Sequence, residues 1–294
     1  MDNRKMVTAD RIKQAVAAVK AARPAYGEML HFYERLFLAQ EAAREKLTLP
    51  LIEISEELLS VKREEGFPII NKAEFSIDFE GSVALMREIC QLSMEANETL
   101  AGASPKIVEA LDKDTLDANA LFSKILIDDE AYFDEVSKAL GVDKTILAFL
   151  GYSSMRPSLT LCAEQLASYL DKGKLWQRGY CPVCGSTPAL SVFREEGARS
   201  LVCGFCSHEW KTTRVYCPFC DNRDQKTLNY FFSEEEKDYR VDVCDQCKKY
   251  VKTVDTREMK HPFYPLVEQV STLHLDLLAQ EQGLESGNPI WLQM

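Results

Sequence analysis

Residues 181–206 read CPVCGSTPALSVFREEGARSLVCGFC, and residues 217–247 read CPFCDNRDQKTLNYFFSEEEKDYRVDVCDQC. Each stretch begins and ends with a Cys-x-x-Cys pair, so eight of the ten cysteines lie in this part of the chain. Between successive pairs lie 18, 10 and 23 residues. The first and last intervals suit a short hairpin, and the middle interval suits a connector. The pairs are Cys181/Cys184, Cys203/Cys206, Cys217/Cys220 and Cys244/Cys247.

This spacing predicts two metal sites, each held by four cysteines. A Cys-x-x-Cys turn directs two thiolates at one point, and two facing turns give a closed tetrahedral site. Soft thiolate ligands in a tetrahedron suit zinc, or iron in a rubredoxin-like centre, and the sulfur count does not choose between them. Proline in Cys-Pro-Val-Cys and Cys-Pro-Phe-Cys stiffens the turn, while Gly185 after the first pair allows a positive φ. Sequential pairing assigns the first two pairs to one ion and the last two to another. A structural role is the default for such sites, because they leave no open position for a substrate.

Two other uses of these cysteines are weaker. Disulfides would need an oxidising compartment, and nothing at the N-terminus marks the chain for export. A thioredoxin-like redox motif needs one pair between a strand and a helix, whereas here four pairs lie among turns. The remaining cysteines, Cys90 and Cys162, fall on apolar helical stripes and are expected to be buried, inert thiols.

Composition indicates a globular protein, and the lack of an export signal or a membrane-spanning stretch leads us to expect a cytoplasmic location. The hydrophobic content is 46% and the formal net charge is −11 over 294 residues. The acidic residues lie mainly outside the cysteine-rich region, which is close to neutral and offers no basic stripe for nucleic acid. No apolar stretch approaches the ~20 residues that a membrane-spanning helix needs.

The first 173 residues show a helical periodicity. Residues 8–47 predict two helices separated at Pro24, and a further helix is expected from Ser82. Gly141 is expected to end a helix, and Asp143 to cap the next. Pro157 suits the first turn of a separate helix that ends at Gly173.

The pattern changes to short strands after residue 174. Residues 189–193 and 200–202 flank a Glu-Glu-Gly turn, and residues 228–232 and 239–243 flank an acidic turn, so two hairpins are predicted. Residues Leu266, Val270, Leu273 and Leu277 then form one helical stripe. We therefore predict an α+β multidomain protein: a mostly helical N-terminal domain (1–173), two tandem rubredoxin-like or zinc-ribbon modules (174–212 and 213–260), and a C-terminal helix and tail (261–294).

One dense polar cluster lies between the second and third cysteine pairs. It contains His208, Glu209, Trp210 and Arg214. His208 could replace a cysteine ligand, but each site already has four sulfurs. The simpler interpretation is a fixed linker in which Trp210 packs, while Glu209 and Arg214 pair or contact a partner protein, because Arg and Trp often anchor interfaces. No pattern typical of a catalytic site is found, so the chain is expected not to be an enzyme.

With these features the chain resembles the formate dehydrogenase accessory protein family (FdhE-type). The resemblance rests on the four cysteine pairs in this order, with Glu209-Trp210 and Arg214 between them and Tyr250-Val-Lys252 after the last. Further similar segments cover most of the chain: Arg23-Pro24 followed by Tyr26 to Gln40, Arg156-Pro157, Leu275-Asp276, Gly283 and Asn288-Pro289. The tail departs from the family, because Leu284 and Glu285 stand where an aromatic and a basic residue are expected.

The resemblance implies a cytoplasmic maturation factor for respiratory formate dehydrogenases. Such a protein is needed for active enzyme and contacts its catalytic subunit, which carries molybdenum or tungsten on a pterin dinucleotide, often selenocysteine, and an iron–sulfur cluster. It also implies zinc or iron in the ribbons and is compatible with a homodimer. The alternatives from other classes are a nucleic-acid-binding zinc-ribbon protein and a rubredoxin-like redox iron protein.

Overall fold

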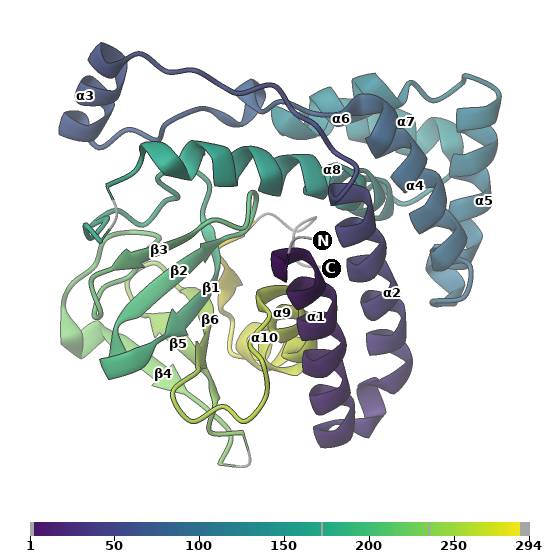
Figure 1. The fold of residues 1–294 in the computed structure, drawn as a ribbon. Helices are drawn as coiled ribbons and strands as arrows, with labels where there is room; N and C mark the ends of the chain where they lie inside the picture. Colours follow the sequence, from purple (N-terminus) through teal and green to yellow (C-terminus); the bar gives the residue numbers. More distant parts are fainter. Residues whose placement is uncertain (1–2, 172, 235, 289–294) are drawn as a thin grey trace. The chain divides into compact units, whose positions relative to one another are not determined.

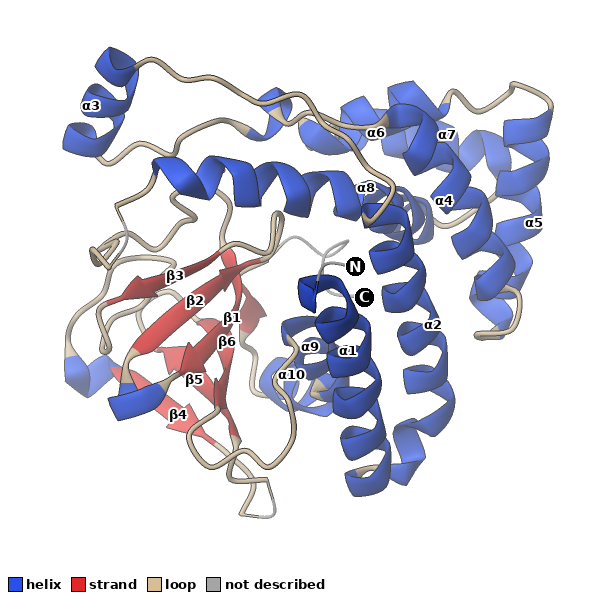
Figure 2. Cartoon of the chain, in the orientation of Figure 1, coloured by secondary structure: helices blue, strands red, loops and turns tan. Residues whose placement is uncertain are grey.

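The computed structural model describes residues 3–171, 173–234 and 236–288. Residues 289–294 lie outside this range, and they include Pro289, which is part of the family resemblance. Ten α-helices are described: α1 (Asn3–Ala22), α2 (Gly27–Arg44), α3 (Glu56–Glu65), α4 (Phe79–Ser93), α5 (Glu98–Asp112), α6 (Ala118–Leu126), α7 (Glu130–Leu140), α8 (Lys144–Leu166), α9 (Pro265–Ser271) and α10 (Leu273–Glu281). The strands are β1 (Pro188–Phe193), β2 (Arg199–Cys203), β3 (Glu209–Thr212), β4 (Leu228–Phe231), β5 (Tyr239–Cys244), β6 (Lys249–Asp255) and β7 (Glu285–Ser286). The chain is thus helical in its N-terminal half and carries one sheet near its C-terminal end (Figures 1 and 2), as the predicted fold class requires.

The chain divides into two compact units. The first contains the described residues up to Leu51 and Lys72–Cys162, and the second contains Ile52–Asn71 and the described residues from Ala163 onward. The domain ranges drawn from the sequence remain predictions, and the two units divide the chain differently. Residues 52–71 and 163–171 group with the cysteine-rich region, and both predicted ribbons fall in the same unit. Among the described residues, no helix combines the length and the apolar character needed to cross a membrane.

The first unit is a set of helices that pack in pairs, α1 against α2, α2 against α4 and α4 against α5. The predicted break at Pro24 is confirmed, because a short 3₁₀ turn at Pro24–Tyr26 separates α1 from α2. Gly141 ends α7 with a φ of 60°, and the Asp143 carboxylate accepts a hydrogen bond from the Thr145 N–H at the start of α8. These three signals are local, so the sequence revealed them.

The helix start predicted at Pro157 is wrong, because Pro157 lies inside the 23-residue helix α8. A proline inside a helix leaves the carbonyl four residues earlier without its partner. Here the carbonyl of Ser153 accepts a hydrogen bond of 2.8 Å from the Gln40 side chain on α2. Gln40 is buried. A distant side chain therefore supplies the donor that the proline lacks, and the helix continues.

The helix α3 was not predicted, although its end signals are present. Ser55 caps its start by accepting from the Leu58 N–H, and Glu56 and Glu57 occupy its first turn. Gly66 ends it with a φ of 74°. The chain then runs beside the first cysteine turn, where the N–H groups of Ile69 and Ile70 donate to the carbonyls of Pro182 and Val183.

Both predicted hairpins are present, and they are joined in one sheet. β1 pairs with β2, and β4 with β5, both antiparallel. Each hairpin gains a further antiparallel strand, β3 beside β2 and β6 beside β5. β1 and β6 then pair in parallel, giving the order β3-β2-β1-β6-β5-β4. The parallel pairing links strands about 60 residues apart in sequence, and no local signal predicts it.

The two faces of the sheet differ because side chains alternate along each strand. One face carries apolar residues of β1, β2, β5 and β6, which pack with Phe263, Leu275, Ala279 and Leu284. Figure 2 shows α9 and α10 beside the sheet. The single C-terminal helix of the prediction is therefore two helices, and Leu277 of the predicted stripe is 60% exposed.

An ion pair is buried on this apolar face. Lys252 on β6 is 8% exposed, and its Nζ lies 2.5 Å from the Asp276 Oδ2 of α10. Lys252 also donates to the Gln269 carbonyl, and Tyr250 donates to Asp276 Oδ1. Burial lowers the pKa of Lys252, and the Asp276 carboxylate opposes this shift. The pair thus fixes α10 on the sheet at the cost of desolvating two charges.

We predict that Asp276→Ala destabilises the protein by about 3–5 kcal/mol, because it leaves the Lys252 ammonium buried without its carboxylate. Urea unfolding followed by tryptophan fluorescence measures this. The double variant Lys252→Met/Asp276→Leu should recover most of the loss, and Lys113→Met, at the exposed position that follows α5, should leave the midpoint unchanged. Equal midpoints for Asp276→Ala and the wild type would contradict the prediction.

Candidate metal centres

The first group of four cysteines is buried. Cys181, Cys184, Cys203 and Cys206 come together with their sulfur atoms within 4.8 Å of one another. The Sγ–Sγ separations are 3.7 Å for Cys181–Cys206, 3.5 Å for Cys184–Cys203 and 3.6 Å for Cys184–Cys206. The two turns that supply these sulfurs lie at the start of the β1–β2 hairpin and at its end.

The second group is more open to solvent. Cys217, Cys220, Cys244 and Cys247 also lie within 4.8 Å of one another, but Cys220 is exposed and Cys247 is partly exposed. The Sγ–Sγ separations are 3.7 Å for both Cys217–Cys247 and Cys220–Cys244. The sequential pairing of the four turns is therefore the pairing that the structure contains.

These separations fit a tetrahedral metal site. Zinc–sulfur bonds of about 2.3 Å at tetrahedral angles place the sulfurs about 3.8 Å apart. The separations of 3.5–3.7 Å lie close to this value and well above a disulfide bond of about 2.05 Å. Each group could therefore hold one metal ion, and the all-sulfur donor set suits zinc or iron. Four protein ligands leave no open position for a substrate in either site.

All four turns share one backbone geometry. The residue after each second cysteine has a positive φ: 76° at Gly185, 63° at Ser207, 57° at Asp221 and 58° at Lys248. In three of them the N–H of that residue donates to the carbonyl of the first cysteine, for example Gly185 to Cys181 at 2.9 Å. The same turn brings backbone N–H groups to the sulfurs, as at Cys203, which accepts from Phe205 and Cys206. Only Gly185 adopts this φ without strain, so the metal bonds and turn hydrogen bonds must hold the other three.

The surroundings of the thiols control their ionisation. Burial raises the pKa of the Cys181 and Cys206 thiols, and it also raises that of Cys217. Burial acts in the same direction on Cys244, but hydrogen bonds from the Asn222 side chain and nearby backbone N–H groups lower its pKa to about 7. A bound metal must displace the remaining thiol protons, so its affinity rises as the pH rises.

The four residues predicted to contact a partner lie in different surroundings. His208 is not among the metal-binding groups found in the described residues, and burial lowers its pKa, so its imidazole is neutral. Glu209 is paired with Arg194 through contacts of 3.0 and 2.6 Å. Trp210 is buried on β3, whereas Arg214 is exposed.

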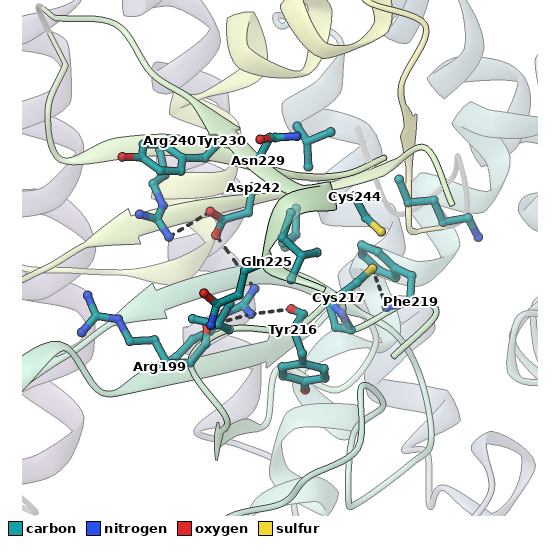
Figure 3. A pocket seen from close by; sticks show the side chains of 17 residues that line it. Arg199, Tyr216, Cys217, Phe219, Gln225, Asn229, Tyr230, Arg240, Asp242 and Cys244 are labelled. Carbon is teal, nitrogen blue, oxygen red and sulfur yellow. Dashed lines mark hydrogen bonds and ion pairs between the residues drawn. The ribbon is translucent and has the colours of Figure 1, made fainter. Parts of the chain in front are cut away.

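A cavity of about 300 Å³ adjoins the second group, and the sequence did not reveal it. Cys217 and Cys244 lie at one end of it, with Phe219, while Arg199 and Arg240 lie at the other end (Figure 3). Arg199 is only 4% exposed. One sequence signal could have indicated this cavity. The alternation Arg240-Val-Asp242-Val in a predicted strand places two charged residues on one face of the sheet.

Three comparisons place the chain among known proteins. Family models described as "FdhE, central domain" and "FdhE, C-terminal domain" match residues 180–214 and 215–292. The chain is 30% identical to Protein FdhE homolog of Haemophilus ducreyi over 246 residues, which cover 80% of this chain and 73% of that protein. It is 34% identical to Protein FdhE homolog of Aquifex aeolicus over 147 residues, a match that spans 49% of this chain and half of that protein.

A solved structure shows the same fold. The crystal structure of the FdhE protein from Pseudomonas aeruginosa matches with a TM-score of 0.65, covering 97% of this chain and 96% of that one. The identity is 20%, so this likeness concerns the fold alone.

We predict that a chelator removes metal from the second group before the first. The exposed Cys220 lets a competing ligand reach the ion, whereas all four cysteines of the first group are buried. Stopped-flow release into a chromogenic chelator should show two phases of equal amplitude, with rates differing about tenfold or more because the surrounding shell controls access. Cys220→Ser should abolish the fast phase, and Cys184→Ser the slow phase. A single phase for both ions would contradict this order.

Proposed function

This chain belongs to the FdhE family, and we propose that it is a non-enzymatic accessory protein required for the assembly of active formate dehydrogenase. In this proposal it binds the catalytic subunit of that enzyme through the metal-stabilised region between Cys181 and Cys247. It releases the subunit once the cofactors of the subunit are in place. The observation that carries the proposal is the pair of closed four-cysteine groups built into one sheet.

The geometry of the groups supports a structural role for the metals. A closed tetrahedral site offers no position at which a substrate could bind. Each hairpin buries little apolar surface by itself, so the free energy of metal binding contributes to its folding. The metal ions would therefore shape the surface that a partner recognises, without taking part in a reaction.

The connector between Cys206 and Cys217 is the proposed contact for the catalytic subunit. It carries His208 and Glu209, which are partly exposed, and Arg214, which is exposed. Both flanking cysteine turns fix its ends, so it is presented in one conformation. Arginine is enriched at interfaces of this kind. The cytoplasm is the proposed location, because reduced thiolates and their metal ions persist in a reducing compartment.

We expect an affinity pull-down from cells respiring formate without oxygen to retain a formate dehydrogenase catalytic subunit. The variant Cys203→Ser/Cys206→Ser should lose it, because the first metal site and the connector fold together. Mass spectrometry of the co-purifying proteins measures this. Cys90→Ala, which removes a buried thiol outside both groups, serves as the matched control and should retain the subunit.

A second variant separates contact from folding. His208→Gln leaves every sulfur ligand in place, so its metal content should equal that of the wild type, while capture of the subunit falls. The accessory role would be overturned if neither the wild type nor any variant retained a formate dehydrogenase subunit. Retention of nucleic acid instead would favour the zinc-ribbon alternative.

A redox function for the second group is a second candidate. The observation that favours it is the exposure of Cys220, since an electron donor could approach this site closely. If it holds iron, anaerobic reduction should bleach the visible absorption of a ferric four-sulfur centre, and Cys220→Ser should lose that change while Cys184→Ser keeps it. Stoichiometric zinc in protein purified without oxygen would exclude this candidate.

A further inference from the structure

The second face of the sheet is charged where the first is apolar. Arg240 and Asp242 alternate with the apolar residues of β5, and Arg199 on β2 is also among the residues that line the cavity beside the second cysteine group. Arg214 and Lys249 complete the charged lining. Four cations and one carboxylate thus line one cavity, all of them in the second compact unit.

The single carboxylate cannot satisfy the three arginines. Asp242 accepts from Arg240 at 2.9 Å and from the Thr253 hydroxyl at 2.5 Å, while the nearest Arg199 nitrogen lies 3.9 Å away. Arg199 donates instead to the Ser191 hydroxyl and to the carbonyls of Tyr216 and Arg214. A guanidinium carries five N–H donors, and one carboxylate cannot accept hydrogen bonds from all the donors of three arginines.

Arg214 and Arg240 have even fewer partners. In the described part of the chain, the Arg214 guanidinium has no ion pair, and it lies over the Phe193 ring at 5.2 Å. Arg240 lies 4.5 Å from the same ring and 4.6 Å from that of Tyr230. Its Nε is buried and has no acceptor among the described residues. The aromatic rings therefore hold two guanidiniums in place. Arg240 keeps Asp242 as its carboxylate partner, whereas Arg214 has no carboxylate partner among the described residues.

The second cysteine group supplies part of the missing charge, because Cys217 interacts electrostatically with Arg199. Four thiolates around a divalent ion carry a net charge of roughly −2. In Figure 3, however, Cys217 and Cys244 lie at the opposite end of the cavity from Arg199 and Arg240. Lys249, which is 6.0 Å from the Phe219 ring, is the cation on that side. Among the residues that line the cavity, three guanidiniums thus stand against the one carboxylate of Asp242, and Asp255 outside the lining is a further acid near Arg240.

We propose that this cavity binds the phosphate group of a small molecule, with the phosphate at Arg199, Arg214 and Arg240. Guanidinium forks match the geometry of phosphate oxygens and bind them in a bidentate manner. The cavity of about 300 Å³ is larger than a bare phosphate ion and lies within the range of small-molecule sites. Tyr216, Phe219 and Tyr230 line the rest of it, so the group attached to the phosphate is flat and aromatic.

The test is calorimetric titration of the metal-loaded full-length protein at constant ionic strength. Three probes separate the sources of binding: inorganic phosphate, phenyl phosphate and benzyl alcohol. We expect phenyl phosphate to bind about tenfold or more tightly than phosphate, because of stacking on the aromatic walls, and benzyl alcohol not to bind. Arg214→Gln and Arg240→Gln should each weaken phenyl phosphate binding about tenfold or more.

Two controls make the result decisive. Arg87→Gln, which changes an arginine paired with Asp112 in the first unit, should bind like the wild type. Metal content measured beside each titration must stay constant. The proposal is overturned if phenyl phosphate does not bind, if both cavity variants bind it as the wild type does, or if heat appears only as metal is lost. Because no partner protein is involved, these outcomes do not depend on the accessory function.

Discussion

Four thiolates converging on one point constrain this protein more than any other interaction. This four-sulfur arrangement occurs twice, and each time it fixes the two ends of one hairpin. The cysteine turns have a positive φ at the residue after the second cysteine, yet three of the four residues at this position are not glycine. Strain of this kind persists only when surrounding bonds hold it. Metal–sulfur bonds, together with the turn hydrogen bonds, would hold this local backbone, and the strands extend from it.

The sheet turns two separate modules into one surface. Parallel pairing of β1 with β6 aligns the hairpin of the first group with that of the second. One face of the combined sheet packs on α9 and α10 and is apolar except for the Lys252–Asp276 pair. The other face collects Arg199, Arg240 and Asp242 from two different hairpins. A charged cavity beside the second metal group exists only because the modules share a sheet.

The two metal groups are equivalent in ligands but not in surroundings. The first is enclosed, partly by the segment after α3, whose N–H groups donate to the carbonyls of the first cysteine turn. The second keeps Cys220 at the surface and adjoins the cavity. The enclosed group is suited to holding the fold together. The open group is the one that solvent, a chelator or a redox partner can reach.

The sequence by itself determined the eight cysteines of the two four-sulfur groups, their sequential pairing, both hairpins and the helix ends at Pro24, Gly141 and Asp143. These features depend on residues close together in the chain, so spacing and turn chemistry suffice to reveal them. Only the tertiary structure decided that α8 continues through Pro157, because the donor that permits it comes from Gln40 on another helix. It also decided that residues 52–71 join the cysteine-rich unit and that three arginines meet in one cavity. Such features depend on which distant segments pack together. The sequence does not reveal them, because contacts between distant segments produce no periodic pattern of residues.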